Sequence, residues 1–330
     1  MLRKIIVPLD TSSLSESAAW KAGALARATS ATVSLVHVYE PPFPAMDGGK
    51  VIDADLLTAD RQEHHRRVTR VVDEIKKRFG CACNYMMLGG DPADAIINYT
   101  QNAHGDLIVM STHGRTGIQR AWFGSVADIL ARESTVPVLL VRGAHAGAGI
   151  DSNKTSPAFP RVVVALDGST SGERVLETVR DLRSSSADVE LLLVQVVAPV
   201  PLPVVGYPDA VLLAGMVTDD KITAAMTAKA RDYLDRIARA LRAESKGPVE
   251  FKVLVAPDTA GAIAGEAREF HADLVALTSH GRGASRLVFG SVADNILRGT
   301  DCSILLRLTK PANRQAANAE SERTKPAFAI

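Results

Sequence analysis

The sequence predicts an α/β protein made of two tandem doubly wound domains, each a five-stranded parallel sheet flanked by helices. Two observations lead to this fold class. The chain repeats itself, since Ile5–Asp10 returns as Val162–Asp167 and segment 113–128 returns as 280–294, both about 160 residues later. Within each copy, short apolar runs alternate with longer helical patterns, which favours parallel strands joined by right-handed crossovers. A repeat of this length indicates a duplicated domain rather than a solenoid unit.

The first copy is predicted to contain five strands alternating with four helices. Its first strand is a buried Ile/Val run that ends at Pro8-Leu9-Asp10, and the Ser and Thr residues at 11–15 offer N-caps to an alanine-rich helix. Polar residues with periodic apolar ones then predict a long amphipathic helix. The expected strands are 3–9, 31–39, 81–88, 106–110 and 137–141, and the expected helices are 18–29, 55–79, 93–101 and 125–133.

The second copy repeats this plan after a segment rich in Gly, Ala, Ser and Pro. The expected strands are 161–166, 188–197, 249–255, 273–278 and 302–308, with helices over 171–183, 219–243, 259–269 and 291–298. The apolar loop 198–218 carries four prolines, and it covers a pocket, docks on a partner or packs on its own domain. We expect domain 1 over 1–142, a linker over 143–160, domain 2 over 161–309 and a disordered tail over 310–330.

Composition limits the classes of function. The 330 residues are 46% hydrophobic and 23% charged with a net charge of +1, so no global field favours nucleic acid or an anionic membrane. The N-terminus lacks the apolar region of a secretion signal and no stretch is long enough to span a bilayer, so we expect a cytoplasmic protein. Cys81, Cys83 and Cys302 form no disulfide framework, and we interpret them as core residues rather than as a metal or redox centre.

A glycine-rich segment follows the fourth strand of each copy and opens the next helix. In the first copy it runs from Ser111 through Gly114 to Gly124. Glycines let backbone N–H groups approach phosphate oxygens closely, and a helix N-terminus favours an anion. Ser125 adds a hydroxyl donor or a metal-coordinating oxygen, or it simply caps the helix. The spacing matches neither the Walker A loop nor the Gly-x-Gly-x-x-Gly fingerprint.

At these residues the chain resembles tandem members of the universal stress protein family, whose fold is Rossmann-like and of the adenine nucleotide α-hydrolase type. The family's nucleotide-binding members share Gly-x2-Gly-x9-Gly-Ser/Thr after strand four and an Asp closing strand one. The resemblance covers both halves apart from linker and tail, and the His-Gly-Arg and Phe-Gly-Ser-Val-Ala-Asp segments are highly typical. It implies ATP as the ligand, with or without Mg2+.

The resemblance also implies how the ligand is held. The adenine would lie near Asp10 or Asp167, the backbone of Val38 or Val196 would face the base, and the triphosphate would follow the glycine loop. The candidate binding residues of the first copy are Pro8, Leu9, Asp10, Val38, Met110, Ser111, Gly114, Arg115, Gly117, Gly124, Ser125 and Val126. Those of the second copy are Ala165, Leu166, Asp167, Val196, Thr278, Gly281, Arg282, Gly290, Ser291 and Val292. Neither a catalytic residue nor a metal ligand is expected.

Two departures from the family pattern make the copies unequal. The first glycine is replaced by Ser111 and by Thr278, each of which either donates a hydrogen bond to the ligand or crowds it. The second copy spaces Gly281 and Gly290 by eight residues rather than nine, which reorients several amides of the loop. The first site is therefore expected to be the more secure one.

Other paired side chains near the loop have two interpretations. The histidines fix the loop more readily than they catalyse, because neither copy supplies a nucleophile. The arginines either pair with phosphate or are exposed, and the aspartates after Gly-Ser suit the first turn of a helix. The strand-one aspartates also suit a metal or a general base, although an adenine acceptor fits the resemblance better. The pairs are His113 and His280, Arg115 and Arg282, Asp128 and Asp294, and Asp10 and Asp167.

Three functions compete. The leading one is an ATP-binding regulatory protein of the stress response, followed by a nucleotide-free interaction or scaffold module. A slow ATPase or nucleotidyl-transfer enzyme ranks last, because the chain lacks the Ser-Gly-Gly-x-Asp-Ser loop and the His-x-Gly-His element of such enzymes. In the resembling family, fifth strands pair antiparallel across a dimer, so 137–141 and 302–306 would form a pseudo-dimer within one chain. A further pairing of two chains and an unknown protein partner stay open.

Overall fold

The computed structural model describes residues 1–10, 12–39, 54–112, 124–142, 157–184, 188–201, 219–244, 247–279 and 290–308. The elements of the first half are β1 (Lys4–Pro8), α1 (Ser13–Thr29), β2 (Thr32–Val38), α2 (Ala54–Phe79), β3 (Cys83–Leu88), α3 (Pro92–Asn102), β4 (Leu107–Ser111), α4 (Ser125–Glu133) and β5 (Val138–Val141). Those of the second half are β6 (Arg161–Ala165), a 3-10 turn (Gly172–Arg174), α5 (Val175–Ser184), β7 (Glu190–Val197), α7 (Asp220–Glu244), β8 (Val249–Val255), α8 (Thr259–Glu269), β9 (Leu274–Ser279), α9 (Ser291–Gly299) and β10 (Ser303–Leu308). The predicted α/β fold class is confirmed.

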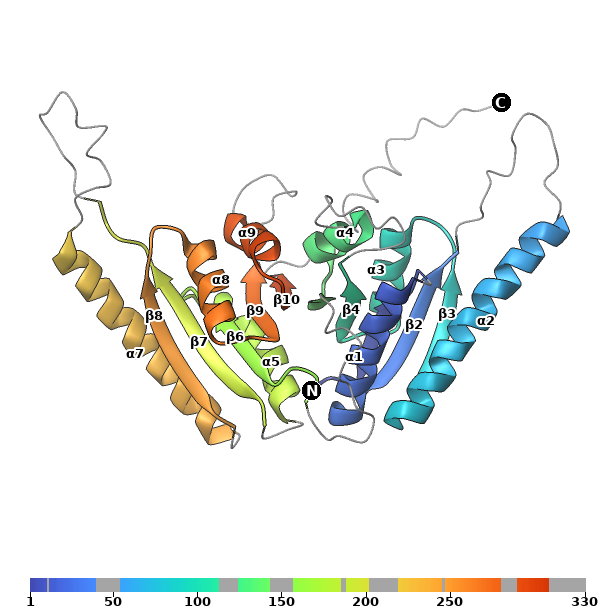
Figure 1. The fold of residues 1–330 in the computed structure, drawn as a ribbon, viewed down its shortest axis with the longest axis horizontal. Coiled ribbons are helices and arrows are strands. Elements are labelled where there is room, and N and C mark those ends of the chain that lie inside the picture. The colour runs from blue at the N-terminus through green and yellow to red at the C-terminus, as the bar shows by residue number, and fades with distance from the viewer. Residues whose placement is uncertain are drawn as a thin grey trace, which may run out of the picture.

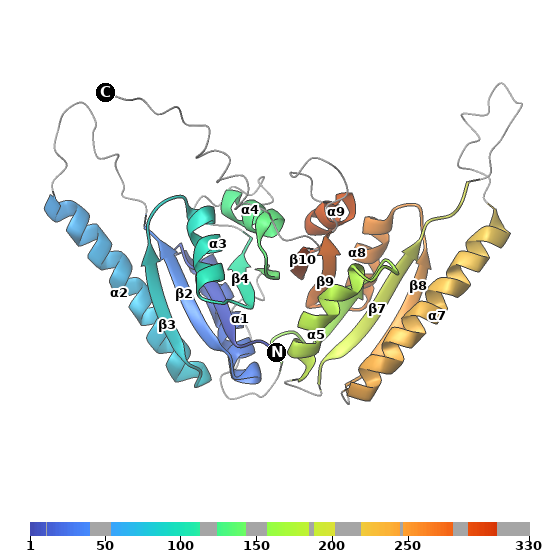
Figure 2. The same ribbon diagram turned by 180° about the vertical axis from the view of Figure 1, so that it is seen from behind.

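The ten strands of the described residues belong to one sheet, in the order β3-β2-β1-β4-β5-β10-β9-β6-β7-β8. Within each half the strands are parallel, and the order reverses between the first and fourth strands, which is where doubly wound sheets bind ligands. The halves join where β5 pairs antiparallel with β10, with Leu139 opposite Leu305. Figure 1 shows α4 and α9 near the centre of the molecule and α2 and α7 at its two outer ends, and Figure 2 shows the same arrangement from behind. The antiparallel contact expected from the resemblance is thus made inside one chain.

Alternation along the strands divides the buried side chains between two cores. Val7 and Val109 point to the face covered by α1, α2, α5 and α7, whereas Ile6 and Ile108 point to the face covered by α3, α4, α8 and α9. Each core runs through both halves without a break. Burying one such aliphatic side chain contributes about 1.5–3 kcal/mol, so the apolar strand runs account for most of the sheet's stability.

The start of the first helix differs between the halves. In α1, Ser12 is the N-cap and its hydroxyl accepts from the Ser15 N–H, so the helix begins five residues before the expected position 18. In the second half the same stretch forms the 3-10 turn Gly172–Arg174 before α5 begins. There the Gly172 N–H donates to Ser169 Oγ at 2.9 Å.

The three cysteines lie in or against the cores. Cys83 is buried, while Cys81 lies just before β3 and packs against the same core. Cys302 packs against the other core. Over the described residues, no group of His, Cys, Asp and Glu has the arrangement of a metal site.

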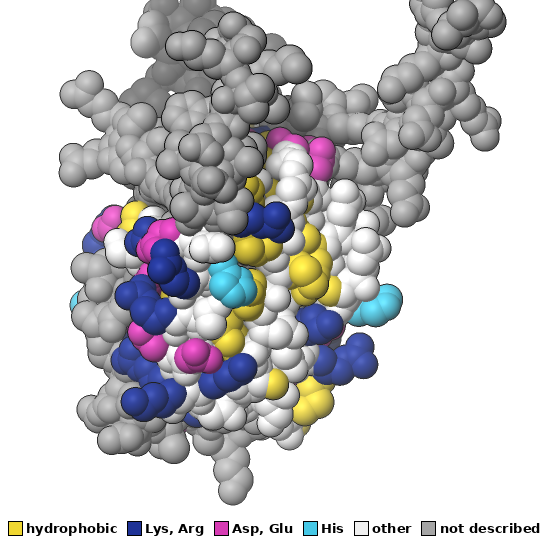
Figure 3. Space-filling model, turned by 90° about the vertical axis from the view of Figure 1, so that its right-hand side faces the viewer, with side chains coloured by type: hydrophobic (Ala, Val, Ile, Leu, Met, Phe, Trp, Pro, Cys, Tyr) yellow, Lys and Arg dark blue, Asp and Glu magenta, His cyan; other side chains and the backbone are white. Residues whose placement is uncertain are grey.

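The described surface carries charges of both signs. Figure 3 shows Lys and Arg side chains mixed with Asp and Glu at the right-hand end of Figure 1, in keeping with the net charge of +1. Among the described helices, none combines the length and the apolar composition needed to cross a membrane. The predicted tail, most of the predicted linker and most of the proline-rich loop lie outside the described residues.

Candidate functional site

Strand register brings the predicted binding residues of each half to one edge of the sheet. β1 lies between β2 and β4, with Pro8 opposite Val36 and Ile6 opposite Ile108. Two residues beyond Pro8, Asp10 leaves its strand beside the end of β2, and the end of β4 lies on its other side. The second half repeats this arrangement at the ends of β6, β7 and β9. The parallel order therefore gathers residues that are far apart in sequence.

The two strand-one aspartates have the same local geometry. Oδ1 of Asp10 accepts from the Ser12 N–H at 3.0 Å and from the Ser12 hydroxyl at 2.6 Å. Oδ1 of Asp167 accepts from the Ser169 N–H and hydroxyl at the same two distances. One oxygen of each carboxylate thus holds the turn from strand to helix and fixes the carboxylate at the sheet edge.

The helices after the glycine loops begin without a side-chain cap. Gly124 precedes α4 and Gly290 precedes α9, and neither start has a capping side chain within the described residues. By contrast α1, α3 and α8 are capped by Ser12, Asp91 and Asp258. The first-turn N–H groups of a helix need acceptors, and the helix dipole makes an anion a favourable one.

Gly124 is not required by the packing of the described residues. A Cβ there would meet only the Thr112 carbonyl oxygen, at 3.7 Å, which is an ordinary contact. The Gly124 N–H donates to that same carbonyl at 3.0 Å, which ties the helix start to the end of β4. A glycine that its protein neighbours do not demand fits a position kept open for a ligand.

The aspartates in the first turns of α4 and α9 are paired with arginines. Asp128 accepts from Arg132 Nε at 2.9 and 3.0 Å, and Asp294 accepts from Arg298 Nε at 2.9 Å. Their predicted place in the first helical turn is confirmed. The arginine four residues later offsets part of the charge that a bound anion would otherwise meet.

In the second half, the hydroxyl of Thr278 makes a hydrogen bond within the protein. Thr278 Oγ1 donates to the Gly172 carbonyl at 2.9 Å and so bridges the end of β9 to the 3-10 turn. A Cβ on Gly172 would lie 2.3 Å from Asp167 Oδ1, so the backbone approaches the carboxylate closely here. While this hydrogen bond is made, the hydroxyl hydrogen of Thr278 is engaged within the protein, and the two roles toward a ligand stay predictions. The residue at the same position in the first half, Ser111, ends β4 and is half-buried.

His37 belongs to the first site and was not predicted. Its Nδ1 lies 2.7 Å from the Leu9 carbonyl oxygen, so Nδ1 carries the hydrogen and donates to the residue before Asp10. The ring stacks on His64 with centroids 4.7 Å apart, and Tyr39 meets His64 edge-on at 5.9 Å. The signal in the sequence is a histidine inside an apolar strand, one residue before Val38.

The second half has Gln195 where the first has His37. The side-chain oxygen of Gln195 is buried without a hydrogen-bond partner in the described part of the chain. Its amide nitrogen lies 3.1 Å from the place a Cβ on Gly168 would take, and Gly168 has a φ of +79°. Gln195 therefore packs against the turn after Asp167 rather than anchoring Leu166.

The remaining predicted residues divide by burial. Leu9, Met110, Leu166 and Thr278 are buried. The half-buried ones are Pro8, Asp10, Val38, Gly124, Val126, Ala165, Val196, Gly290 and Val292, and the exposed ones are Ser125, Asp167 and Ser291. Gly114, Arg115, Gly117, Gly281 and Arg282 lie outside the described residues, as do His113 and His280. The structure thus brings the strand ends and helix starts together and leaves the loop residues as predictions.

Comparison with known families gives the same division into halves. The model of the universal stress protein family matches residues 1–142 and again 158–306. The chain belongs to the universal stress protein family. Its relatives include the universal stress protein MJ0531 of Methanocaldococcus jannaschii, 32% identical over 145 residues that cover 43% of this chain and 83% of that protein.

Solved structures of universal stress proteins match one half or both. One from Archaeoglobus fulgidus covers 93% of this chain and 98% of its own, with a TM-score of 0.63 and 18% identity, which shows a shared fold over both halves. Another, in complex with cAMP, is 25% identical, covers 42% of this chain and 97% of its own and has a TM-score of 0.34. The recognition of a tandem universal stress protein from the sequence is confirmed.

Proposed function

We propose that this universal stress protein is an ATP-binding regulatory protein of the stress response, with its secure site in the first half. The observation that carries the proposal is the meeting of Asp10, the end of β4 and the uncapped start of α4 at one sheet edge. Doubly wound sheets bind ligands at this switch point in strand order. The proposed ligand has a base that would donate a hydrogen bond to Asp10 and phosphates that would bind at the start of α4.

The phosphate part of the proposal rests on α4. Its first-turn N–H groups lack a side-chain cap in the described residues, and the Gly124 position leaves space beside them. A phosphate would supply the missing acceptor, and its charge would interact favourably with the helix dipole. Ser125 is exposed at the first helical position, where its hydroxyl would add a donor.

The base part rests on the ends of β1 and β2. Asp10 is held in place by Ser12, so its carboxylate would accept from an adenine amino group without losing rotamer freedom on binding. Val38 is half-buried at the end of β2, and its backbone would face the base. His37 fixes the Leu9 carbonyl and thereby the approach to Asp10.

The second half suits a nucleotide-free interaction module. The hydrogen bond from Thr278 to Gly172 spans the two elements between which a ligand would enter. Breaking it would leave a buried hydroxyl and a carbonyl to find new partners, which lowers the net free energy of binding. We therefore propose that the second half contacts a protein partner and holds ATP weakly or not at all.

The test is mass spectrometry of the ligand released from freshly purified full-length protein, combined with an ATP titration by calorimetry. The expected result is an adenine nucleotide in the released material and saturable ATP binding, with ADP formed far more slowly than ATP exchanges. If no nucleotide is released and none binds at millimolar concentration, the nucleotide-free module replaces the proposal.

A further inference from the structure

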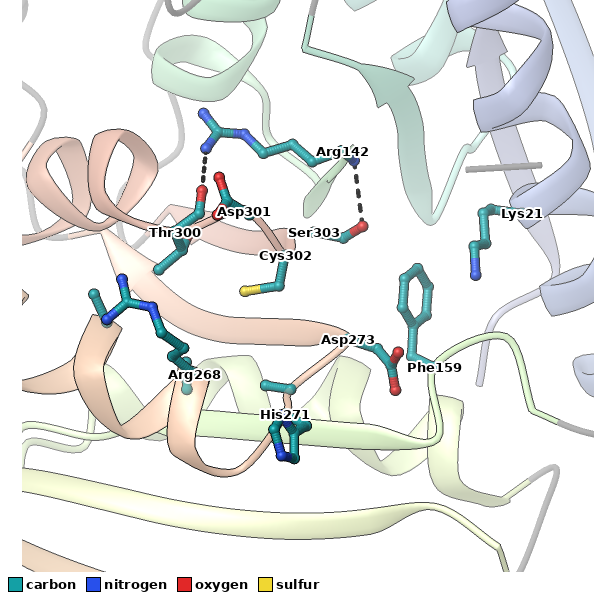
Figure 4. Close-up of a pocket in the computed structure, with 13 residues that line it drawn as sticks. Lys21, Arg142, Phe159, Arg268, His271, Asp273, Thr300, Asp301, Cys302 and Ser303 are labelled. Atoms are coloured by element: carbon teal, nitrogen blue, oxygen red, sulfur yellow. Dashed lines mark hydrogen bonds between the residues drawn. The ribbon is translucent and has the colours of Figure 1, made fainter. Parts of the chain in front are cut away.

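A cavity of about 390 Å³ lies where the two halves meet (Figure 4). It sits at the amino ends of β9 and β10, away from the strand ends that form the candidate nucleotide site of the second half. Its volume falls within the range of small-molecule sites. The residues that line it are Lys21, Arg142, Phe159, Ala264, Ala267, Arg268, His271, Ala272, Asp273, Thr300, Asp301, Cys302 and Ser303. We call this cavity the junction pocket.

Both halves contribute to the junction pocket. Lys21 comes from α1 and Arg142 follows β5, while Arg268 comes from α8 of the second half. Figure 4 shows Arg142 and Arg268 at the end of the pocket near Thr300, and Lys21 at the other end near Phe159. The cavity therefore depends on the contact between the two halves.

The charged residues of the junction pocket are mainly basic. Lys21, Arg142 and Arg268 form no ion pair with a carboxylate among the described residues. Of the two lining carboxylates, Asp273 accepts from the Arg161 N–H at 2.9 Å, and Asp301 is exposed. Three cations face two carboxylates, so a bound anion would improve the charge balance.

Two of these cations are partly desolvated. Burial lowers the pKa of Lys21, and the nearby charge of Asp273 offsets part of this effect. Burial likewise lowers the pKa of Arg142, offset in part by Cys302 and Asp301. A cation that has lost water gains more from a counter-ion than an exposed one does.

Arg142 is held rigidly at the wall of the pocket. Its Nη1 donates to the Thr300 carbonyl at 2.6 Å, and its backbone N–H donates to Ser303 Oγ at 3.3 Å. Its Nε is buried and has no hydrogen-bond partner in the described part of the chain. The guanidinium is thus fixed with donor capacity left over, which lowers the entropy lost on binding.

The duplicated fold provides an internal control. Aligning the halves through Asp10 and Asp167, through α3 and α8 and through β5 and β10 shows which residues stand at the corresponding positions of the other half. Thr178 corresponds to Lys21, Leu308 to Arg142 and Gln101 to Arg268. All three cations are therefore replaced by neutral residues, so the fold itself does not require them.

The pocket also has an apolar wall. Phe159, Ala264 and Ala267 are all buried, and Lys21 Nζ lies 5.0 Å from the centroid of the Phe159 ring while it donates to the Ala158 carbonyl at 2.9 Å. A wholly inorganic anion would leave this wall without contacts. An anion that carries a short hydrocarbon part would use both the cations and the wall.

We propose that the junction pocket binds a small organic anion, a carboxylate or phosphate monoester with a short apolar part. Its acidic group lies at Arg142 and Arg268, and its hydrocarbon part lies against the two alanines and Phe159, at the end of the pocket where Lys21 lies. Residues from α1 and the end of β5 in the first half meet residues from α8 and the start of β10 in the second half in this pocket. Binding of the ligand therefore depends on the contact between the halves. The proposal is independent of ATP binding.

The test is a calorimetric titration of the full-length chain at low salt with phenyl phosphate, compared with inorganic phosphate. We expect saturable binding of one phenyl phosphate per chain and weaker binding of inorganic phosphate. Arg268→Gln should weaken phenyl phosphate about tenfold, as expected for the loss of a charge-assisted contact. Lys21→Met should weaken it less, because Lys21 lies at the other end of the pocket beside Phe159. Arg298→Gln is the matched control, because Arg298 is an exposed arginine on the neighbouring α9 that does not line the pocket.

Two readouts keep the proposal falsifiable. Arg268 is exposed, so Arg268→Gln should keep the melting temperature of the parent protein, and a loss of affinity then reflects the site. Gly124→Glu, which places a carboxylate at the phosphate position of the first site, should leave phenyl phosphate binding unchanged. The proposal is overturned if phenyl phosphate does not saturate, if Arg268→Gln binds like the parent, or if only Gly124→Glu loses binding, since the anion then occupies the nucleotide site.

Discussion

The two halves of the chain share a strand order and a set of capped turns, yet they differ at the edge where a nucleotide would bind. In the first half, His37 anchors Leu9, and α1 begins as a regular helix capped by Ser12. In the second half, Thr278 is bonded to Gly172 in a 3-10 turn. The packing of the halves is thus repeated, while the side-chain contacts at the two proposed ligand edges differ. The repeated motif therefore predicts the repeated fold but not these contacts.

The largest effect should come from placing a carboxylate at the start of α4. Gly124→Glu should reduce ATP affinity about a hundredfold, because the new anion occupies the phosphate position and repels the triphosphate. Among the described residues its Cβ meets only the Thr112 carbonyl oxygen, at 3.7 Å, so the melting temperature should stay close to that of the parent. Gly290→Glu is the matched variant in the second half, and calorimetry should find ATP affinity changed less than twofold. Equal losses in both variants would contradict the inequality of the halves.

The next effect concerns the bridge in the second half. Thr278→Ala removes the hydrogen bond to Gly172 and should raise the ATP affinity of the second half about tenfold, measured as a second binding event in calorimetry. It should also cost about 1 kcal/mol of unfolding free energy. Thr100→Ala is the control, since Thr100 is a buried threonine that donates to the Ile96 carbonyl away from both edges. If Thr100→Ala also shows a second ATP-binding event, the hydrogen bond from Thr278 to Gly172 is not what weakens ATP binding in the second half.

A smaller effect should follow from removing the anchor of Leu9. His37→Leu leaves the Leu9 carbonyl without the imidazole donor and should lower the free energy of unfolding by about 1 kcal/mol, with a loss of ATP affinity. Gln195→Leu in the second half should cost less, because the buried Gln195 oxygen has no partner in the described residues. Urea denaturation of both variants measures the difference. A larger loss for Gln195→Leu would reverse the comparison.

A last effect is absent at neutral pH and appears only at alkaline pH. Burial, with a further contribution from Cys81, raises the pKa of the Cys83 thiol from 9.0 to about 12. Above pH 9 the unfolded chain loses this proton and the folded chain keeps it, so the free energy of unfolding falls between pH 9 and pH 12, by at most about 1.4 kcal/mol per pH unit. Cys83→Ala should remove this part of the decline, seen in urea denaturation at pH 8, 9 and 10. If the unfolding free energy of Cys83→Ala falls with pH as steeply as that of the parent, Cys83 ionises in the folded state.

Local sequence patterns predicted the fold because the spacing of apolar residues follows directly from which side of a strand or helix is buried. The Ile/Val runs that end at Asp10 and Asp167 gave the strands, and the repeat at segment 280–294 gave the duplication. The contact between the fifth strands followed from the family resemblance. The late start predicted for α1 was wrong because the cap at Ser12 extends the helix.

Contacts between residues that are far apart along the chain could not be predicted from the sequence. The bond from Thr278 to Gly172 joins residues 106 apart, and nothing in either segment predicts it. His37 was missed because its partner is a backbone carbonyl. The junction pocket was missed for a similar reason, since Lys21 and Arg142 meet Arg268 only after the halves have joined. The glycine-loop residues 113–123 and 280–289 are still known from the sequence alone.

The inequality of the two halves is tested most directly by the stoichiometry of ATP on the full-length chain, measured by native mass spectrometry across an ATP titration. We predict one ATP per chain over the range in which the first site fills, and none over the same range for Gly124→Glu. Two equivalent ATP molecules per chain, or one that persists in Gly124→Glu, would contradict it.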